Sequence, residues 1–157
     1  MYQLEVKRWL VAHRFMPADG WSVTVDVDSM ERGVHGTQPL GKKEIAAECE
    51  NWLRAQGVKI VAHPLFGRAD LVATKEGSGT FIVEVEGKSS KQKEQAMYSA
   101  IGQIVLSMKE ARSDLHYAVA MPDNSEWERQ LMKVPDAVKQ ILKLHLLLVS
   151  PEGVRAL

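Results

Sequence analysis

Two short stretches decide the fold of this chain, GRADLV at residues 67–72 and FIVEVEGK at residues 81–88. Each contains an apolar run of strand length, and the segment between them contains two glycines, which is typical of a hairpin turn. The hairpin would bring Asp70, at the start of the first strand, beside Glu84 near the end of the second. Carboxylates that leave an apolar strand on one side are costly unless they meet a cation. Hard oxygen ligands of this kind suit Mg²⁺ or Mn²⁺.

The second stretch ends in a series of charged side chains. Because side chains alternate between the two faces of a strand, Glu84, Glu86 and Lys88 share one face, and Val83 and Val85 share the other. The sequence therefore places two acids and a lysine together at one end of a buried strand.

The bulk properties allow one domain with a real core. The 157 residues carry 20 basic and 20 acidic side chains, so the formal net charge is zero. Zero net charge argues against a protein that coats nucleic acid through bulk charge, but it allows binding through a local patch. The sequence shows no signal peptide and no apolar run of membrane-spanning length. We therefore expect a soluble, cytoplasmic protein that makes no use of a membrane.

Hydrophobic periodicity predicts a mixed sheet flanked by helices. The predicted helices cover residues 2–15, 42–56, 90–111 and 125–142, and the predicted strands cover residues 21–27, 58–63, 68–74, 80–86, 115–121 and 144–149. Pro135 is predicted to start a new helix or a kink within the last helical segment. Residues 29–40 are predicted to form a loop. We therefore divide the chain into an N-terminal helix and strand appendage at residues 1–40 and a main domain at residues 41–157.

The order of these elements and motifs resembles the PD-(D/E)xK nuclease superfamily, which includes restriction endonucleases, Holliday-junction resolvases and RecB-type nuclease domains. Its αβββαβ core matches residues 42–121. The resemblance therefore implies an α/β fold with a restriction endonuclease-like core, the N-terminal appendage and a C-terminal helix-strand extension. The metal-binding aspartate of the superfamily begins the second core strand, which is the position of Asp70. The (D/E)xK element matches in two ways: EVE at residues 84–86 fits a glutamate-ending version, and EGK at residues 86–88 fits the lysine-ending version displaced by two residues.

The resemblance implies a Mg²⁺- or Mn²⁺-dependent endonuclease that hydrolyses DNA phosphodiester bonds. Asp70, Glu84 and Glu86 would form the metal site, with Glu86 on a metal-bound or attacking water. Lys88 would offset charge on the phosphorus and help to deprotonate the water. Gln103 occupies the place of a glutamine that the superfamily often carries in the helix after the third strand, and it would orient the water or contact the DNA backbone.

The resemblance also implies residues around this centre. The first core helix of the superfamily often carries an acid, and Glu48 or Glu44 could supply it. The predicted contacts to DNA phosphates are basic side chains close to the motif, namely Arg68, Lys88, Lys91 and Lys93.

Two other functions fit the same sequence. One is a binding module on the same fold that holds nucleic acid or a protein partner without cutting, because Glu86 stands where many members of the superfamily have lysine. The other is a subunit of a larger nuclease complex that is active only with its partner. For a nuclease acting alone, one active site cuts one strand, so cleavage of a duplex favours a two-fold homodimer.

Overall fold

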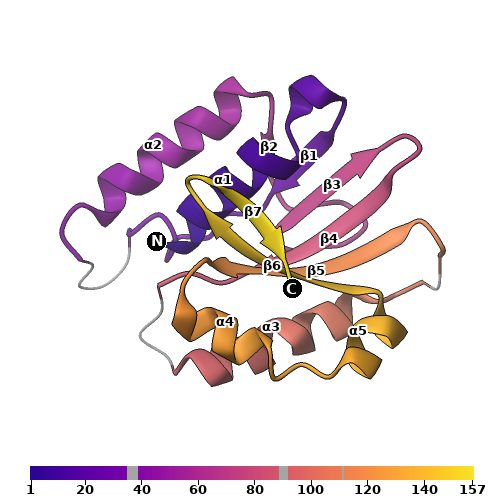
Figure 1. Cartoon of the computed structure of the whole chain (residues 1–157). Helices are drawn as coiled ribbons and strands as arrows, with labels where there is room; N and C mark the ends of the chain where they lie inside the picture. Colours follow the sequence, from indigo (N-terminus) through magenta and orange to yellow (C-terminus); the bar gives the residue numbers. More distant parts are fainter. Residues whose placement is uncertain (35–38, 89–91, 111) are drawn as a thin grey trace.

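The computed structural model describes residues 1–34, 39–88, 92–110 and 112–157. They form a mixed sheet with helices on both faces (Figure 1). Within these residues the strands are β1 Ser22–Val25, β2 Lys59–Ile60, β3 Leu71–Lys75, β4 Gly79–Val85, β5 Leu115–Pro122, β6 Leu144–Ser150 and β7 Gly153–Ala156. The helices are α1 Gln3–Arg14, α2 Lys42–Ala55, α3 Lys93–Ser107, α4 Ser125–Leu131, α5 Asp136–Leu142 and the short 3₁₀ helix η1 Pro17–Asp19. The predicted class, a mixed α/β protein, is confirmed.

The sheet is antiparallel in one half and parallel in the other. Its strand order is β2-β1-β3-β4-β5-β6-β7 among the described residues. β3 runs antiparallel to both β1 and β4, whereas β4, β5 and β6 run parallel because α3 and the α4–α5 segment cross between them. At the two edges, β2 is parallel to β1 and β7 is antiparallel to β6. The predicted hairpin is confirmed, since Leu71 pairs with Val83. Asp70 therefore lies next to the end of β4.

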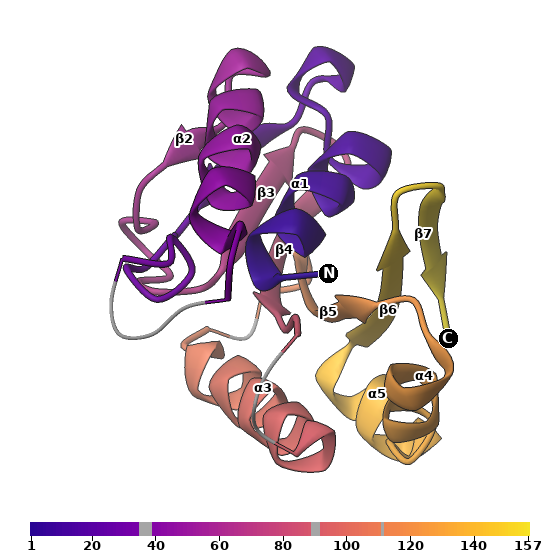
Figure 2. The same cartoon turned by 90° about the vertical axis from the view of Figure 1, so that its left-hand side faces the viewer.

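The two faces of the sheet bury different apolar sets, because strand side chains alternate. On one face, Val83 packs in a cluster with Leu10 of α1 and Leu53 of α2. On the other face, Ile82 packs in a cluster with Ile104 of α3 and with side chains of α4. Figure 2 shows the two helix layers, with α1 and α2 on one side of the sheet and α3, α4 and α5 on the other. The end of β4 lies between the layers.

The structure differs from the prediction in the first half of the chain. The strand predicted at residues 58–63 is only Lys59–Ile60, and it pairs with β1 at the edge of the sheet rather than with β3. Beyond it the chain carries Pro64, which cannot donate a ladder hydrogen bond, and Gly67, which has a positive φ of 62°. β1 takes the place beside β3 instead. The division at residue 40 stays a prediction, although residues on both sides of it contribute to one sheet and one apolar cluster.

The second half follows the prediction closely. Pro135 precedes α5, so the helical segment predicted at residues 125–142 consists of α4 and α5. The hairpin partner β7 was not predicted from the sequence. No helix in the described part of the chain combines the length and apolar character that a membrane span requires.

Candidate functional site

A cleft of about 1170 Å³ opens at the end of β4. Its walls come from the start of α1, the segment after β1, the residues before β3, the end of β4 and one side of α3. Segments distant in sequence therefore meet at the point where β4 leaves the sheet. The lining residues include Gln3, Asp26, Glu31, Arg68, Asp70, Glu84, Glu86, Lys88 and Gln103.

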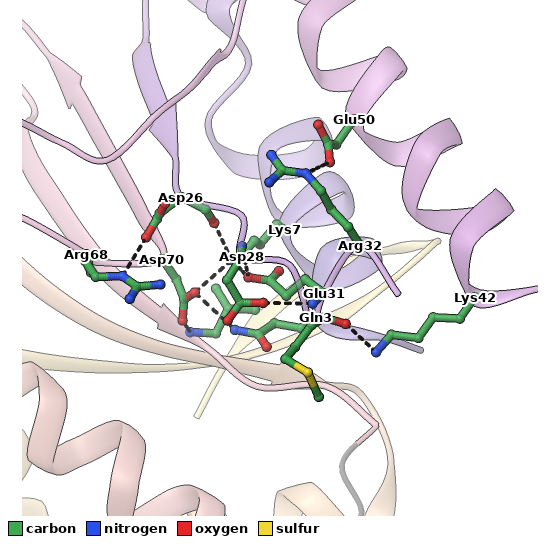
Figure 3. A network of polar contacts seen from close by, with 12 residues as sticks. Gln3, Lys7, Asp26, Asp28, Glu31, Arg32, Lys42, Glu50, Arg68 and Asp70 are labelled. Atoms are coloured by element: carbon green, nitrogen blue, oxygen red, sulfur yellow. Dashed lines mark hydrogen bonds and ion pairs between the residues drawn. The ribbon is translucent and has the colours of Figure 1, made fainter. Parts of the chain in front are cut away.

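Asp70 is held in place by three donors, two from α1 and one from β4. Its Oδ2 accepts a hydrogen bond of 2.9 Å from the Val85 amide, and its Oδ1 accepts one of 3.0 Å from the Gln3 side chain. The Lys7 ammonium lies 2.7 Å from the same Oδ1 (Figure 3). A carboxylate offers about four lone-pair sites, so three donors leave capacity for a further ligand. The carboxylate is thus fixed by α1 and β4 without being saturated.

Glu84 is the buried acid of the site. Its residue is only 4% exposed, and it projects from β4 toward the α3 layer because it shares a face with Ile82. Burial raises the pKa of Glu84 to about 9, and the Asp70 carboxyl adds to the rise through its charge and a hydrogen bond. The charge of Lys7 lowers the pKa of Glu84, but by less than burial and Asp70 raise it. At neutral pH the Asp70–Glu84 pair therefore holds a proton that a cation could replace.

Lys7 reaches the acids from the buried face of α1. Its side chain is fully buried, and its ammonium contacts the Asp26 carbonyl oxygen at 2.6 Å and the Glu31 carboxylate at 2.8 Å. Burial alone would lower the pKa of Lys7, but the carboxylates of Asp70 and Glu31 outweigh it and raise that pKa. Burial raises the pKa of Glu31 to about 7, against the opposing charge of Lys7. Lys7 is therefore a buried cation that lies beneath the acids at the floor of the cleft.

The donor set at the floor fits a divalent cation. Asp70 and Glu84 supply hard carboxylate oxygens, which Mg²⁺ and Mn²⁺ prefer. The close contact of the two carboxyls needs either a proton or a cation between them, as the pKa of Glu84 indicates. In the described ranges no three His, Cys, Asp or Glu side chains gather into a complete ligand group. The pair would hold an ion together with water, which is the usual habit of Mg²⁺.

The cleft also gathers four other residues that the sequence singled out. Arg68 is exposed at the rim, and its guanidinium lies 3.4 Å from the Asp26 carboxylate. Lys88 is exposed too, with its ammonium 5.9 Å from the centre of the Tyr2 ring. Glu86 lines the same cleft half-buried, and its charge contributes to the raised pKa of Glu84. Gln103 faces the cleft from the exposed side of α3.

Three predicted residues fall elsewhere. Glu48 is exposed on α2, where it pairs with Arg8 at 2.9 Å, because α2 packs against α1 and not over the end of β4. Glu44, the alternative acid, is also exposed on α2 outside the cleft lining. Lys93 pairs with Glu126 of α4 at 2.6 Å. Lys91 lies outside the described residues.

Sequence reasoning missed Gln3, Lys7 and Glu31. A signal for Lys7 was present, because it lies among the buried apolar positions of α1, three residues after Leu4 and three before Leu10. A lysine on an apolar helix face is seldom buried without a partner. For Gln3 and Glu31 the sequence carries no such signal, since both reach the site only through the packing of α1 and the segment after β1.

No family model, no curated protein and no solved structure matches this chain significantly. The fold and cleft nevertheless define a class of protein. It is a mixed α/β protein whose cleft has an acidic floor with a buried lysine and cationic side chains at the rim. Any narrower assignment rests on the chemistry of that cleft.

Proposed function

We propose that the chain is a metal-dependent nuclease of the PD-(D/E)xK type that hydrolyses DNA phosphodiester bonds. The observation that carries the proposal is the contact between Asp70 and Glu84 at the floor of a cleft whose rim carries Arg68 and Lys88. Two carboxyls in contact that share a proton suit a divalent ion, and rim cations suit phosphates. The acid pair would bind the metal ion, and the rim cations would bind the phosphates of the DNA.

The connectivity of the chain supports this type. In chain order α1, β1, β3, β4, α3 and β5 give the αβββαβ sequence of the superfamily, with three antiparallel strands followed by a parallel crossover. In this alignment α1 is the first core helix, and α2 with β2 is an insertion between β1 and β3. The alignment differs from the one expected at residues 42–121, and it brings Gln3 and Lys7 into the proposed site.

Each residue has a distinct part in the proposed reaction. Asp70 and Glu84 would hold Mg²⁺ or Mn²⁺, which when bound supplies Lewis acidity toward a phosphoryl oxygen and acidifies water. The Val85 amide and the Gln3 side chain orient Asp70. Glu86, lining the same cleft, would orient the attacking water. Cations at the rim would stabilise the negative charge that develops on the phosphorane.

The rim residues would position the substrate. Arg68 and Lys88 would bind backbone phosphates, and Gln103 would contact the backbone or the water from α3. Such contacts orient nucleic acid without reading its sequence. Cleavage of both strands of a duplex would need a second copy of the chain.

One observation favours a second function, a module on the same fold that binds nucleic acid without cutting it. The Lys7 ammonium already contacts Asp70, whereas the Lys88 ammonium lies 5.9 Å from the centre of the Tyr2 ring. A cation already at the floor weakens the attraction for a metal ion. The rim would still hold phosphates in this case.

Nicking of supercoiled plasmid in Mn²⁺ tests the proposal. The wild-type chain should nick the plasmid, and either EDTA or Glu84→Gln should reduce cleavage to background, because the variant keeps the size of the side chain and removes its charge. Glu126→Gln is the matched control, since Glu126 is exposed on α4 outside the cleft lining and should leave the rate unchanged.

Cleavage that persists in Glu84→Gln would refute the assignment. Absence of cleavage by a folded wild-type chain that binds DNA would favour the binding module. The same assay on duplex, single-stranded and RNA oligonucleotides would then define the substrate.

A further inference from the structure

Three oxygens surround the Lys7 ammonium at the floor of the cleft. They are the Asp26 carbonyl oxygen at 2.6 Å, Asp70 Oδ1 at 2.7 Å and Glu31 Oε1 at 2.8 Å (Figure 3). The lysine side chain has no exposed surface. The arrangement is thus an oxygen shell around a buried positive charge.

The segment after β1 is organised to present Glu31 to this point. The Glu31 amide donates to Asp28 Oδ1 at 2.8 Å, and the Asp28 amide donates to Glu31 Oε1 at 3.4 Å. Glu31 is 9% exposed, and its second oxygen, Oε2, is buried with no hydrogen-bond partner. A buried carboxylate oxygen without a donor is costly, so it indicates capacity for a further ligand.

Nothing in the packing of α1 requires a lysine at this position. The neighbouring buried residues of the helix, Leu4, Val6, Leu10 and Val11, are all apolar. Two carboxylates and a carbonyl oxygen are a ligand set that divalent cations also use. The distances of 2.6–2.8 Å are those of an ammonium ion, and a divalent ion in its place would draw the oxygens closer. The ammonium therefore stands where a metal ion could stand.

We infer that the oxygens of Asp26, Glu31 and Asp70 form a second cation site, distinct from the Asp70–Glu84 pair, and that the Lys7 ammonium is its resident cation. The cleft then takes one divalent ion and not two. Lys7 acts as a positioning residue, because it fixes the Asp70 carboxylate that the two sites share. The count of one ion rests on the proposed function, whereas the second site rests on the contacts of Lys7 alone.

Two substitutions at Lys7 separate a cation site from a packing role. Lys7→Ala removes the charge and opens room for an ion with its water, whereas Lys7→Met removes the charge but fills the same space. If the position served packing alone, Met would be tolerated better than Ala in every buffer. If it is a cation site, Mn²⁺ should stabilise the Ala variant and not the Met variant.

The readout is the unfolding midpoint, Tm, of the full chain in EDTA and in Mn²⁺ at about a hundredfold above its dissociation constant. Mn²⁺ should raise the Tm of Lys7→Ala by roughly 5–10 °C more than that of Lys7→Met. The double variant Lys7→Ala/Glu31→Gln has one fewer buried charge than Lys7→Ala and should therefore be more stable than it in EDTA. It should lose the extra stabilisation by Mn²⁺.

Counting bound Mn²⁺ by electron paramagnetic resonance separates this inference from the proposed function. The expected counts are one ion for the wild type and two for Lys7→Ala. A count of zero for the wild type and one for Lys7→Ala would refute the proposed metal site and leave the second cation site standing. Equal counts with equal Tm shifts in the Ala and Met variants would overturn the inference, and so would a Lys7→Ala chain that stays unfolded in Mn²⁺.

Discussion

Gly87, two residues after the end of β4, lies close against the start of α1. A methyl group added there would lie 2.6 Å from the Tyr2 carbonyl carbon and 2.7 Å from Gln3 Cα, and closer still to the Gln3 nitrogen. The neighbouring Lys88 amide donates to the Met1 carbonyl oxygen at 2.7 Å, so this approach is fixed by a backbone hydrogen bond. Gly87→Ala must therefore move backbone, since no flexible side chain can give way.

The size of the effect follows from these distances. Ordinary contacts of a Cβ atom begin near 3.4 Å, so the start of α1 and the end of β4 must separate by about 1 Å. Overpacking of this kind lowers the free energy of unfolding by about 1–3 kcal/mol. For a chain of this length the Tm should fall by roughly 2–12 °C. The shift would also draw Gln3 away from Asp70, and a misplacement near 1 Å can lower turnover about 100-fold.

The assay is thermal unfolding of Gly87→Ala beside Gly102→Ala. Gly102 lies inside α3 with no atom within 4 Å of an added Cβ, so alanine there should stabilise the chain by up to about 1 kcal/mol. A Gly87→Ala chain with the Tm of the wild type would refute the close approach of α1 to β4. A fall that is equal in both variants would show that the effect is not specific to this contact.

Three further predictions concern the charges of the site. The pKa of Glu84 is about 9 in the folded chain against an ordinary 4.5, so the folded chain keeps a proton that the unfolded chain loses between these values. In EDTA the free energy of unfolding should therefore fall as the pH rises from about 5 to 9, and Glu84→Gln should flatten this profile; a profile that rises in the wild type would contradict the burial of the acid. Arg68→Ala and Lys88→Ala should each weaken DNA binding and reduce the slope of log K against log salt by about 1 in fluorescence anisotropy, whereas Lys133→Ala, outside the cleft, should change neither. Glu48→Ala should change the free energy of unfolding by less than about 0.5 kcal/mol and leave Mn²⁺ binding intact, because Glu48 is 71% exposed on α2; loss of Mn²⁺ binding in calorimetry would bring it back into the site.

The sequence predicts the β3–β4 hairpin and its acids well, for a physical reason. Apolar alternation and the glycines of the turn are local signals, and a two-strand register carries Asp70 to Glu84 with no long-range information. Gln103, which the resemblance singled out on the helix after the third strand, lines the same cleft. The roles of these residues stay predictions.

The features that the sequence did not predict depend on packing between elements distant along the chain. Residues 21–27 and 58–63 carry similar strand signals, and only the assembled sheet shows that β1 takes the place beside β3. Glu48 lies on the helix expected to cover the site, but α2 packs on α1 and turns it toward Arg8. Lys7 enters the site because α1 crosses the end of β4, which no local pattern encodes.

In the proposed metal site, a divalent ion would replace the proton held by the Asp70–Glu84 pair. Titration calorimetry of Mn²⁺ at pH 7, in buffers of different ionisation enthalpy, measures the protons released for each ion bound. Because the pKa of Glu84 is about 9, we expect the wild type to release close to one proton for each Mn²⁺ bound. We expect Glu84→Gln to release no proton. Mn²⁺ binding by the wild type without proton release, or no binding at all, would contradict it.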